Sequence, residues 1–132
     1  MTELHGNLSG IRDSHIKQIE ELYQYPVGSD EFLPPDLARI LAGHSAAINR
    51  EISIYISRGG DVLDITVGYL DNVSLAELSL RRSRERLSMV RCIHTHPGGS
   101  AHLSDVDLTA LKTLRLDAMC ALGVDGEGRV TG

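Results

Sequence analysis

The residues with the clearest chemical potential lie in one segment, residues 94–107. His94 and His96 are two positions apart at the end of an expected strand, so both side chains leave the same face of it. Pro97 and two glycines then turn the chain, and Asp107 falls in the first turn of the next expected helix, where an anion is favoured. Two imidazoles and one carboxylate can bind a zinc ion and leave a fourth position for water, which is the catalytic pattern. The spacing therefore predicts a zinc site that can generate hydroxide near neutral pH.

Each of these residues also has an ordinary structural explanation. A pair of histidines on a strand is usually not a metal site. Ser104 can cap the following helix, and Asp107 three positions later supports the same cap. His102 is expected in a solvated loop, and Cys92, on the same strand face as His94, is either a fourth ligand or a buried core thiol. A metal site here would also be compatible with a binding module that catalyses nothing.

Helices and strands must position this cluster. Helical spacing of apolar residues predicts helices over residues 13–23, 35–48 and 104–115. Alternating or continuous apolar runs predict strands over residues 51–57, 62–67, 88–96 and 117–124, with another beginning at Arg129. Asp13 or Ser14 is expected to cap the first helix, Pro35 suits the first turn of the second, and residues 58–61 predict a hairpin turn. The fold class predicted is α/β, a mixed sheet flanked by helices.

Length and composition bound the organisation of the chain. Its 132 residues fit one domain, which we place at residues 13–132 after a lead-in segment over residues 1–12. The sequence stops four residues into the second arm of a hairpin, so we expect a fragment of a longer chain.

Composition also excludes several protein classes. Hydrophobic residues make up 42% and charged residues 23%, which is typical of globular proteins, and no apolar run is long enough to cross a membrane. The net charge of -5 excludes a globally basic nucleic-acid binder. The chain begins with no signal peptide, and its two cysteines are expected to be reduced thiols, so we expect a cytoplasmic protein.

The segment that contains the histidines resembles a known motif. His94-x-His96-Pro97, six residues, Ser104, two residues and Asp107 match the motif of the JAMM (MPN+) metalloproteases, and the segment also resembles the related RadC family. The resemblance implies a cytidine-deaminase-like arrangement of the fold. It further implies that His94, His96 and Asp107 bind zinc and that Ser104 stabilises the oxyanion formed from an amide carbonyl.

The same resemblance implies a glutamate on an earlier strand as the general base. Glu51 opens the first expected strand after a helix, which is where the family has this residue. Glu77 and Glu85 are alternatives, although neither starts a clear strand. The family usually follows its glutamate with a small residue, whereas this chain continues with Ile52 and Ser53.

Several stretches also resemble the N-terminal region of HflX-type GTPases, in the longer forms that carry an extension. They are residues 6–12, 48–53, 86–96 and 114–117. The resemblance implies a cytoplasmic, ribosome-associated GTP-binding protein that acts on the large subunit, of which this chain is an N-terminal accessory domain. The chain contains no Gly-x-x-x-x-Gly-Lys-Ser/Thr loop, so GTP and magnesium are expected to bind only in the GTPase domain of the host.

The sequence has one basic concentration, formed by Arg81, Arg82, Arg84, Arg86 and Arg91, and the first four are the candidate RNA contacts. Such charges bind phosphate backbones, so rRNA contact is one interpretation and a solvated surface loop is the other. No aromatic residues are interleaved, which argues against base stacking.

Two functions follow from these patterns. One is an accessory domain of an HflX-type protein that carries a zinc site. The alternative is a JAMM-like zinc-dependent peptidase or isopeptidase that hydrolyses an amide bond.

Overall fold

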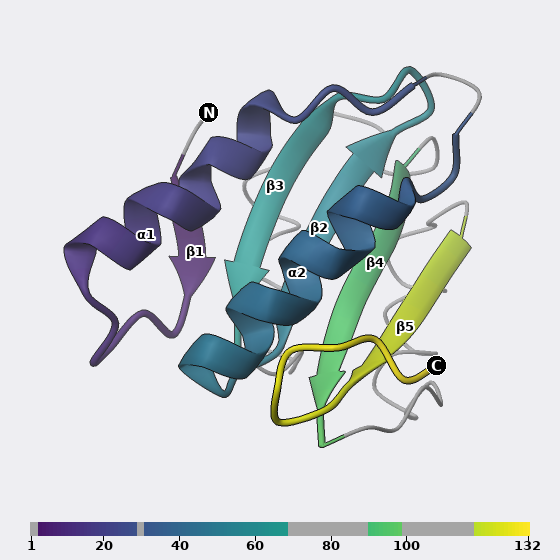
Figure 1. Ribbon diagram of the computed structural model, residues 1–132. Helices are drawn as coiled ribbons and strands as arrows, with labels where there is room; N and C mark the ends of the chain where they lie inside the picture. Colours follow the sequence, from purple (N-terminus) through teal and green to yellow (C-terminus); the bar gives the residue numbers. More distant parts are fainter. Residues whose placement is uncertain (1–2, 29–30, 69–89, 99–117) are drawn as a thin grey trace.

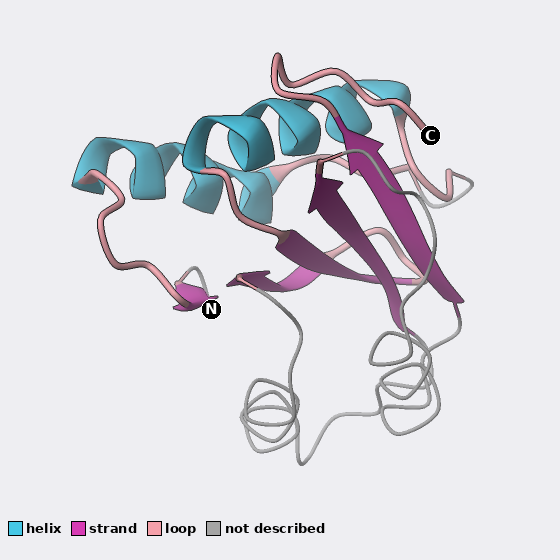
Figure 2. Cartoon of the chain, turned by 90° about the horizontal axis from the view of Figure 1, so that it is seen from below, coloured by secondary structure: helices cyan, strands magenta, loops and turns pink. Residues whose placement is uncertain are grey.

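The computed structural model describes residues 3–28, 31–68, 90–98 and 118–132. Two α-helices, α1 (Asp13–Glu20) and α2 (Pro35–Ile48), and a 3₁₀ helix, η1 (Glu21–Gln24), pack on a five-stranded sheet. The strands are β1 (Leu4–Gly6), β2 (Ile52–Ser57), β3 (Val62–Val67), β4 (Val90–Pro97) and β5 (Ala118–Val124). Both helices lie on the same face of the sheet (Figures 1 and 2). The expected α/β class is confirmed.

The sheet is mixed and has the order β1-β3-β2-β4-β5. β2 runs antiparallel to both β3 and β4, while β1 pairs with β3 and β5 pairs with β4 in parallel. The hairpin expected at residues 58–61 joins β2 to β3, and the backbone N–H of Gly60 donates to the carbonyl of Ser57 at 3.0 Å. β4 and β2 therefore lie side by side in the centre of the sheet, where both can contribute to one site.

The hydrophobic core lies between the helices and the sheet. Its sheet side is formed by alternate residues, among them Ile52, Ile54 and Ile93, each 0% exposed. Leu37 and Leu41 of α2 complete it from the helix side. Burial of each such side chain stabilises the fold by about 1.5–3 kcal/mol. The helical spacing and the strand alternation in the sequence thus predicted most of the packed surface, although Ile40 of α2 is 37% exposed.

The opposite face of the sheet is also buried but carries polar residues. Ser53 pairs with His94 on one side and with Thr66 on the other, so these three side chains form a row across the central strands. Tyr55 pairs with Cys92 in the next row. Cross-strand partners project from the same face. The two faces of the sheet therefore differ in chemistry although both exclude water.

One difference from the sequence predictions near the N-terminus concerns the first helix. Asp13 and Ser14 do not cap α1: the N-cap is Arg12, with no side-chain cap hydrogen bond, and its carbonyl accepts from the backbone N–H groups of His15 and Ile16. The expected helix also tightens to a 3₁₀ turn at residue 21. Tertiary packing has replaced a local capping preference.

The second difference is β1, which the sequence did not predict. Leu4 is buried and pairs in parallel with Ile65, and the hydroxyl of Tyr23 donates to the carbonyl of Glu3 at 2.6 Å. Gly6 ends the strand with a φ of +91°, and a Cβ there would lie 2.1 Å from the carbonyl oxygen of Val67. Only glycine fits this close approach, because any side chain would collide with the backbone of β3.

The remaining elements follow the expected pattern where the structure describes them. Pro35 is in the first turn of α2, and Val130 forms an isolated antiparallel bridge with Val124 after the turn at residues 125–128. Cys92 and Cys120, both among the described residues, are not joined in a disulfide. The helix expected at residues 104–115 lies outside the described residues. Among the helices described, none has the length and apolar character needed to cross a membrane.

Candidate metal centre

Three potential metal ligands converge at the end of β4 and the start of β2. One ligand atom from each of Glu51, His94 and His96 lies within 4.8 Å of the other two. His96 Nε2 is 3.3 Å from Glu51 Oε1, and the His94 and His96 rings meet edge to face with centroids 4.6 Å apart. Glu51 is 8% exposed and His94 is 0% exposed. The cluster therefore combines two imidazoles and a carboxylate in a place that is largely shielded from water.

Strand register brings the three residues together. His94 and His96 are two apart on β4, so they share the sheet face opposite the helices. β2 is antiparallel to β4, with Ser53 opposite His94. Moving two residues back along β2 and two forward along β4 puts Glu51 opposite His96. The carboxylate thus meets the imidazoles because of an antiparallel register.

The backbone of Glu51 is held on both sides. Its carbonyl accepts a hydrogen bond from the N–H of Gly68 at 2.8 Å, which extends the pairing with β3. Just before it, Asn49 ends α2 in the left-handed region at a φ of 52°, and the N–H of Arg50 donates to the carbonyl of Ser45 at 3.2 Å. This helix ending turns the chain directly from α2 into β2. Glu51 is therefore placed by main-chain bonds as well as by its own side chain.

A buried hydrogen-bond chain supports the site from the helix-covered side. Thr95 lies between the two histidines but projects to the opposite face, where its hydroxyl accepts from the N–H of Ile52 at 2.9 Å. The same hydroxyl donates to Ser45 Oγ at 2.7 Å, and Ser45 Oγ donates to the carbonyl of Arg50 at 2.7 Å. Ser45 and Thr95 are both 0% exposed. These hydrogen bonds connect the backbone around Glu51 to β4 and α2, and they therefore fix the spacing of the ligands.

Arg50 extends this anchoring to the N-terminal segment. Its guanidinium donates to the carbonyl of Asn7 at 2.9 Å and also to the carbonyl of Ser9. Arg50, the residue next to Glu51, is consequently held by two elements: Ser45 of α2, through its carbonyl and its hydroxyl, and residues 7–9. Such outer contacts commonly orient the residues that bind a metal.

The donor set fits a divalent metal ion of borderline softness. Two ligands of a tetrahedral zinc ion at ~2.1 Å are roughly 3.4 Å apart, which matches the 3.3 Å between His96 Nε2 and Glu51 Oε1. A buried carboxylate is costly unless a partner compensates its charge, and a divalent cation would do so. Two histidines and one carboxylate suit zinc, and the same set also suits ferrous iron. The buried group could therefore hold a metal ion.

The structure brings together only part of the residue set expected from the sequence. His94 and His96 lie together as expected, and Glu51, expected as a general base, lies close enough to be a ligand. Cys92 is buried on the same strand face but does not belong to the three-residue group found among the described residues.

Other expected site residues lie outside the described residues. These are Glu77, Glu85, His102, Ser104, Asp107 and the arginines Arg81, Arg82, Arg84 and Arg86.

The residues that support the site were not predicted from the sequence. Ser45 and Thr95 were not identified, although the position of Thr95 between two candidate ligands was a usable signal. Ser53 was also missed: it is 0% exposed, and its hydroxyl has no hydrogen-bond partner among the residues the structure describes. As the cross-strand partner of His94, it belongs to the same face as the ligands.

Comparisons of the chain with protein-family models, with curated proteins and with solved structures found no match.

Proposed function

We propose that this chain is a metal-binding accessory domain in which Glu51, His94 and His96 hold a zinc ion. The observation that carries the proposal is the convergence of their ligand atoms within 4.8 Å at a largely buried position. The JAMM-like motif adds Asp107 as a further ligand and Ser104 as a neighbour of the bound ion. It also supports a finer, cytidine-deaminase-like description of the fold.

Elemental analysis of the purified protein tests the metal site. The wild-type protein is expected to carry about one zinc ion per chain more than the His96→Ala variant, because that variant lacks one imidazole ligand. His102→Ala is the matched control, a histidine from the same stretch that the proposal does not use. Equal zinc content in wild type and a folded His96→Ala variant, after incubation with zinc, would refute the site.

The proposed host of this domain is an HflX-type, ribosome-associated GTPase of the cytoplasm. The order and spacing of the four resembling stretches support it, and GTP and magnesium would bind in the GTPase domain of that host. The arginines at 81, 82, 84 and 86 are the candidate contacts to rRNA of the large subunit.

Ribosome co-sedimentation of the full-length host tests this part of the proposal. Arg82→Glu with Arg84→Glu should weaken association and reduce its dependence on salt, since fewer phosphate contacts remain. Arg129→Glu, a change of an exposed arginine elsewhere in the chain, is the control. Unchanged co-sedimentation of the double variant would exclude these arginines as ribosome contacts.

A second candidate function is hydrolysis of a peptide or isopeptide-like amide. The position of Glu51, 3.3 Å from His96 and at the start of a strand, favours it because a carboxylate beside a metal site can serve as a general base. A bound metal would supply Lewis acidity toward the carbonyl. Glu51 would take the proton of the attacking water, and Ser104 would donate a hydrogen bond to the oxyanion, a role worth ~2.7–4 kcal/mol for one donor.

Glu51→Gln separates the two roles of this carboxylate. If Glu51 is the base, the variant keeps its zinc and loses amide hydrolysis measured on a peptide library; if it is a ligand, the variant loses zinc as well. Hydrolysis that persists in Glu51→Gln would show that another residue is the base. Glu31→Gln, at an exposed position before α2, is the control.

A further inference from the structure

A second pair of histidines lies in the helical layer, away from the face that carries Glu51. His15 of α1 and His44 of α2 are 29 residues apart in sequence, and their ring nitrogens Nε2 and Nδ1 are 2.9 Å apart. The ring centroids are 5.1 Å apart and the ring planes are tilted by 49°. Two imidazole nitrogens from two different helices thus meet at one point on the surface of the helical layer.

The protonation of this pair suits it to bind a cation. A hydrogen bond between two imidazoles needs one N–H and one lone pair, so one of the two facing nitrogens is unprotonated. An ion that binds both nitrogens requires the proton of the facing N–H to move to the other nitrogen of the same ring, which keeps that imidazole neutral. Burial, followed by the neighbouring His15, lowers the pKa of His44, while Glu21 acts in the opposite direction. Neutral imidazole is the form that binds metals.

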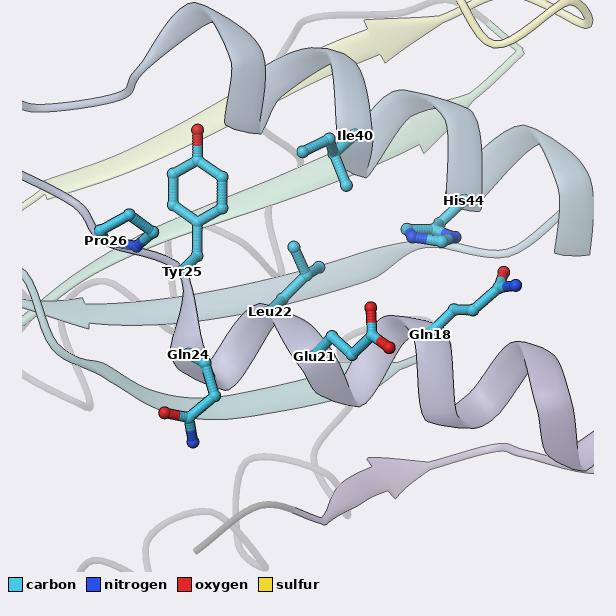
Figure 3. A pocket seen from close by; sticks show the side chains of 8 residues that line it. All are labelled: Gln18, Glu21, Leu22, Gln24, Tyr25, Pro26, Ile40 and His44. Atoms are coloured by element: carbon cyan, nitrogen blue, oxygen red, sulfur yellow. The ribbon is translucent and has the colours of Figure 1, made fainter.

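Oxygen donors lie beside the pair. A groove of about 600 Å³ runs between α1–η1 and α2, and its lining includes Gln18, Glu21 and His44. Figure 3 shows the Gln18 side chain of α1 and the Glu21 side chain of η1 reaching toward the side of the groove where His44 lies. The groove is open to solvent and has room for water. An ion held by the histidines would therefore be accessible to water, with the Glu21 carboxylate lining the same groove as His44.

We propose that His15 Nε2 and His44 Nδ1 bind one divalent transition-metal ion between α1 and α2, with water completing its coordination. The separation of 2.9 Å fits two neighbouring ligands at roughly 90° about an ion at ~2.1 Å, after a small turn of the rings. Imidazole ligands favour Zn²⁺, Ni²⁺ and Cu²⁺, with Cu²⁺ bound most tightly.

This ion would clamp the two helices together. An ion that binds the native state and not the unfolded state stabilises the protein by mass action. It would also add a second ion to any measurement of metal content, so the two sites have to be counted separately.

Metal stoichiometry in four proteins tests the proposal. Calorimetric titration with Ni²⁺ and elemental analysis after loading with Zn²⁺ should give two ions for the wild type. One ion is expected for His15→Gln/His44→Gln, one for His96→Ala and none for the combined variant. Lys17→Ala, an exposed change on the same helix that does not line the groove, is the control and should behave like the wild type.

Failure of this proposal differs from failure of the site at Glu51. If a folded His15→Gln/His44→Gln variant binds as many ions as the wild type, the helical site is refuted. The opposite result is that the wild type binds one ion, that His15→Gln/His44→Gln binds none and that His96→Ala still binds one. It would support the helical site and refute the site at Glu51.

Spectroscopy keeps the proposal testable if the double variant does not fold. Paramagnetic resonance of Cu²⁺ bound to His96→Ala should show two nitrogen ligands, and the single change His15→Gln should reduce this to one. A spectrum that is identical with and without His15 would also overturn the proposal.

Discussion

The two faces of the sheet are formed by the same strands but differ in the kind of side chain they present. The helix-covered face presents Ile52, Ile54 and Ile93 to the core, whereas the opposite face presents Ser53, His94 and further polar side chains. Both faces are buried, so exposure to water does not explain the difference. Alternation along a strand lets each neighbouring residue serve a different face.

Neighbouring residues of one strand therefore contribute to different properties, one to the stability of the core and the next to the candidate metal site. The apolar face supplies hydrophobic burial, which is non-directional and tolerates approximate packing. The polar face needs partners in defined positions, because each buried polar group must be matched. Thr95 connects the two, since it lies between the histidines but bonds on the helix-covered side.

Among the tests of this difference between the faces, the largest effect on stability is expected from Ile54→Ala. Truncation of this fully buried side chain leaves a cavity in the core, so the free energy of unfolding should fall by about 2–5 kcal/mol. Denaturant titration of the metal-free protein measures this loss. Zinc affinity of the folded fraction should stay within a few-fold of wild type, and a large loss of affinity would show that the two faces are not separable.

Thr95→Val is expected to lower stability by a smaller amount and to lower zinc affinity as well. The change keeps the shape of the side chain but removes the hydrogen bonds that the Thr95 hydroxyl makes with the N–H of Ile52 and with the Ser45 hydroxyl, at a cost of about 1–3 kcal/mol in the free energy of unfolding. Because the chain of bonds positions Glu51, zinc affinity should also fall by roughly 10–100-fold.

Thr66→Val is the matched control for this prediction. Thr66 is a buried strand threonine whose hydroxyl donates to Asp64 Oδ1 at 3.3 Å, outside the bonds that hold Glu51. It should lose stability without a comparable loss of zinc affinity, measured by competition with a chelator. Equal losses of affinity in the two variants would mean that the Thr95 hydroxyl has no special role.

The smallest effect concerns Cys120, which packs against the helix-covered core. Burial raises the pKa of this thiol above its ordinary value of 9.0. A thiol whose pKa is higher in the folded state contributes stability below the unfolded pKa, and this contribution is lost as pH rises through the folded pKa. Stability should therefore decline slightly less with alkali in Cys120→Ala than in wild type, measured by denaturation between pH 8 and 10.

Local patterns determined the parts of the molecule that depend on neighbouring residues. Alternation predicted β2 and β3, the glycines predicted the turn between them, and Pro35 marked the start of α2. The two-residue spacing of His94 and His96 placed them on one face. Each of these features follows from the geometry of a single element, so the sequence by itself was sufficient.

Contacts between distant residues required the tertiary structure. The parallel pairing of β1, the meeting of His15 with His44 and the bonds from Thr95 to Ser45 join elements that the sequence does not relate. Glu51 opened an expected strand, but only the register of β2 on β4 decided that it meets His96. The periodicity of one strand decides which of its residues share a face, but it does not decide which strand lies beside it or which of the permitted offsets the pair adopts.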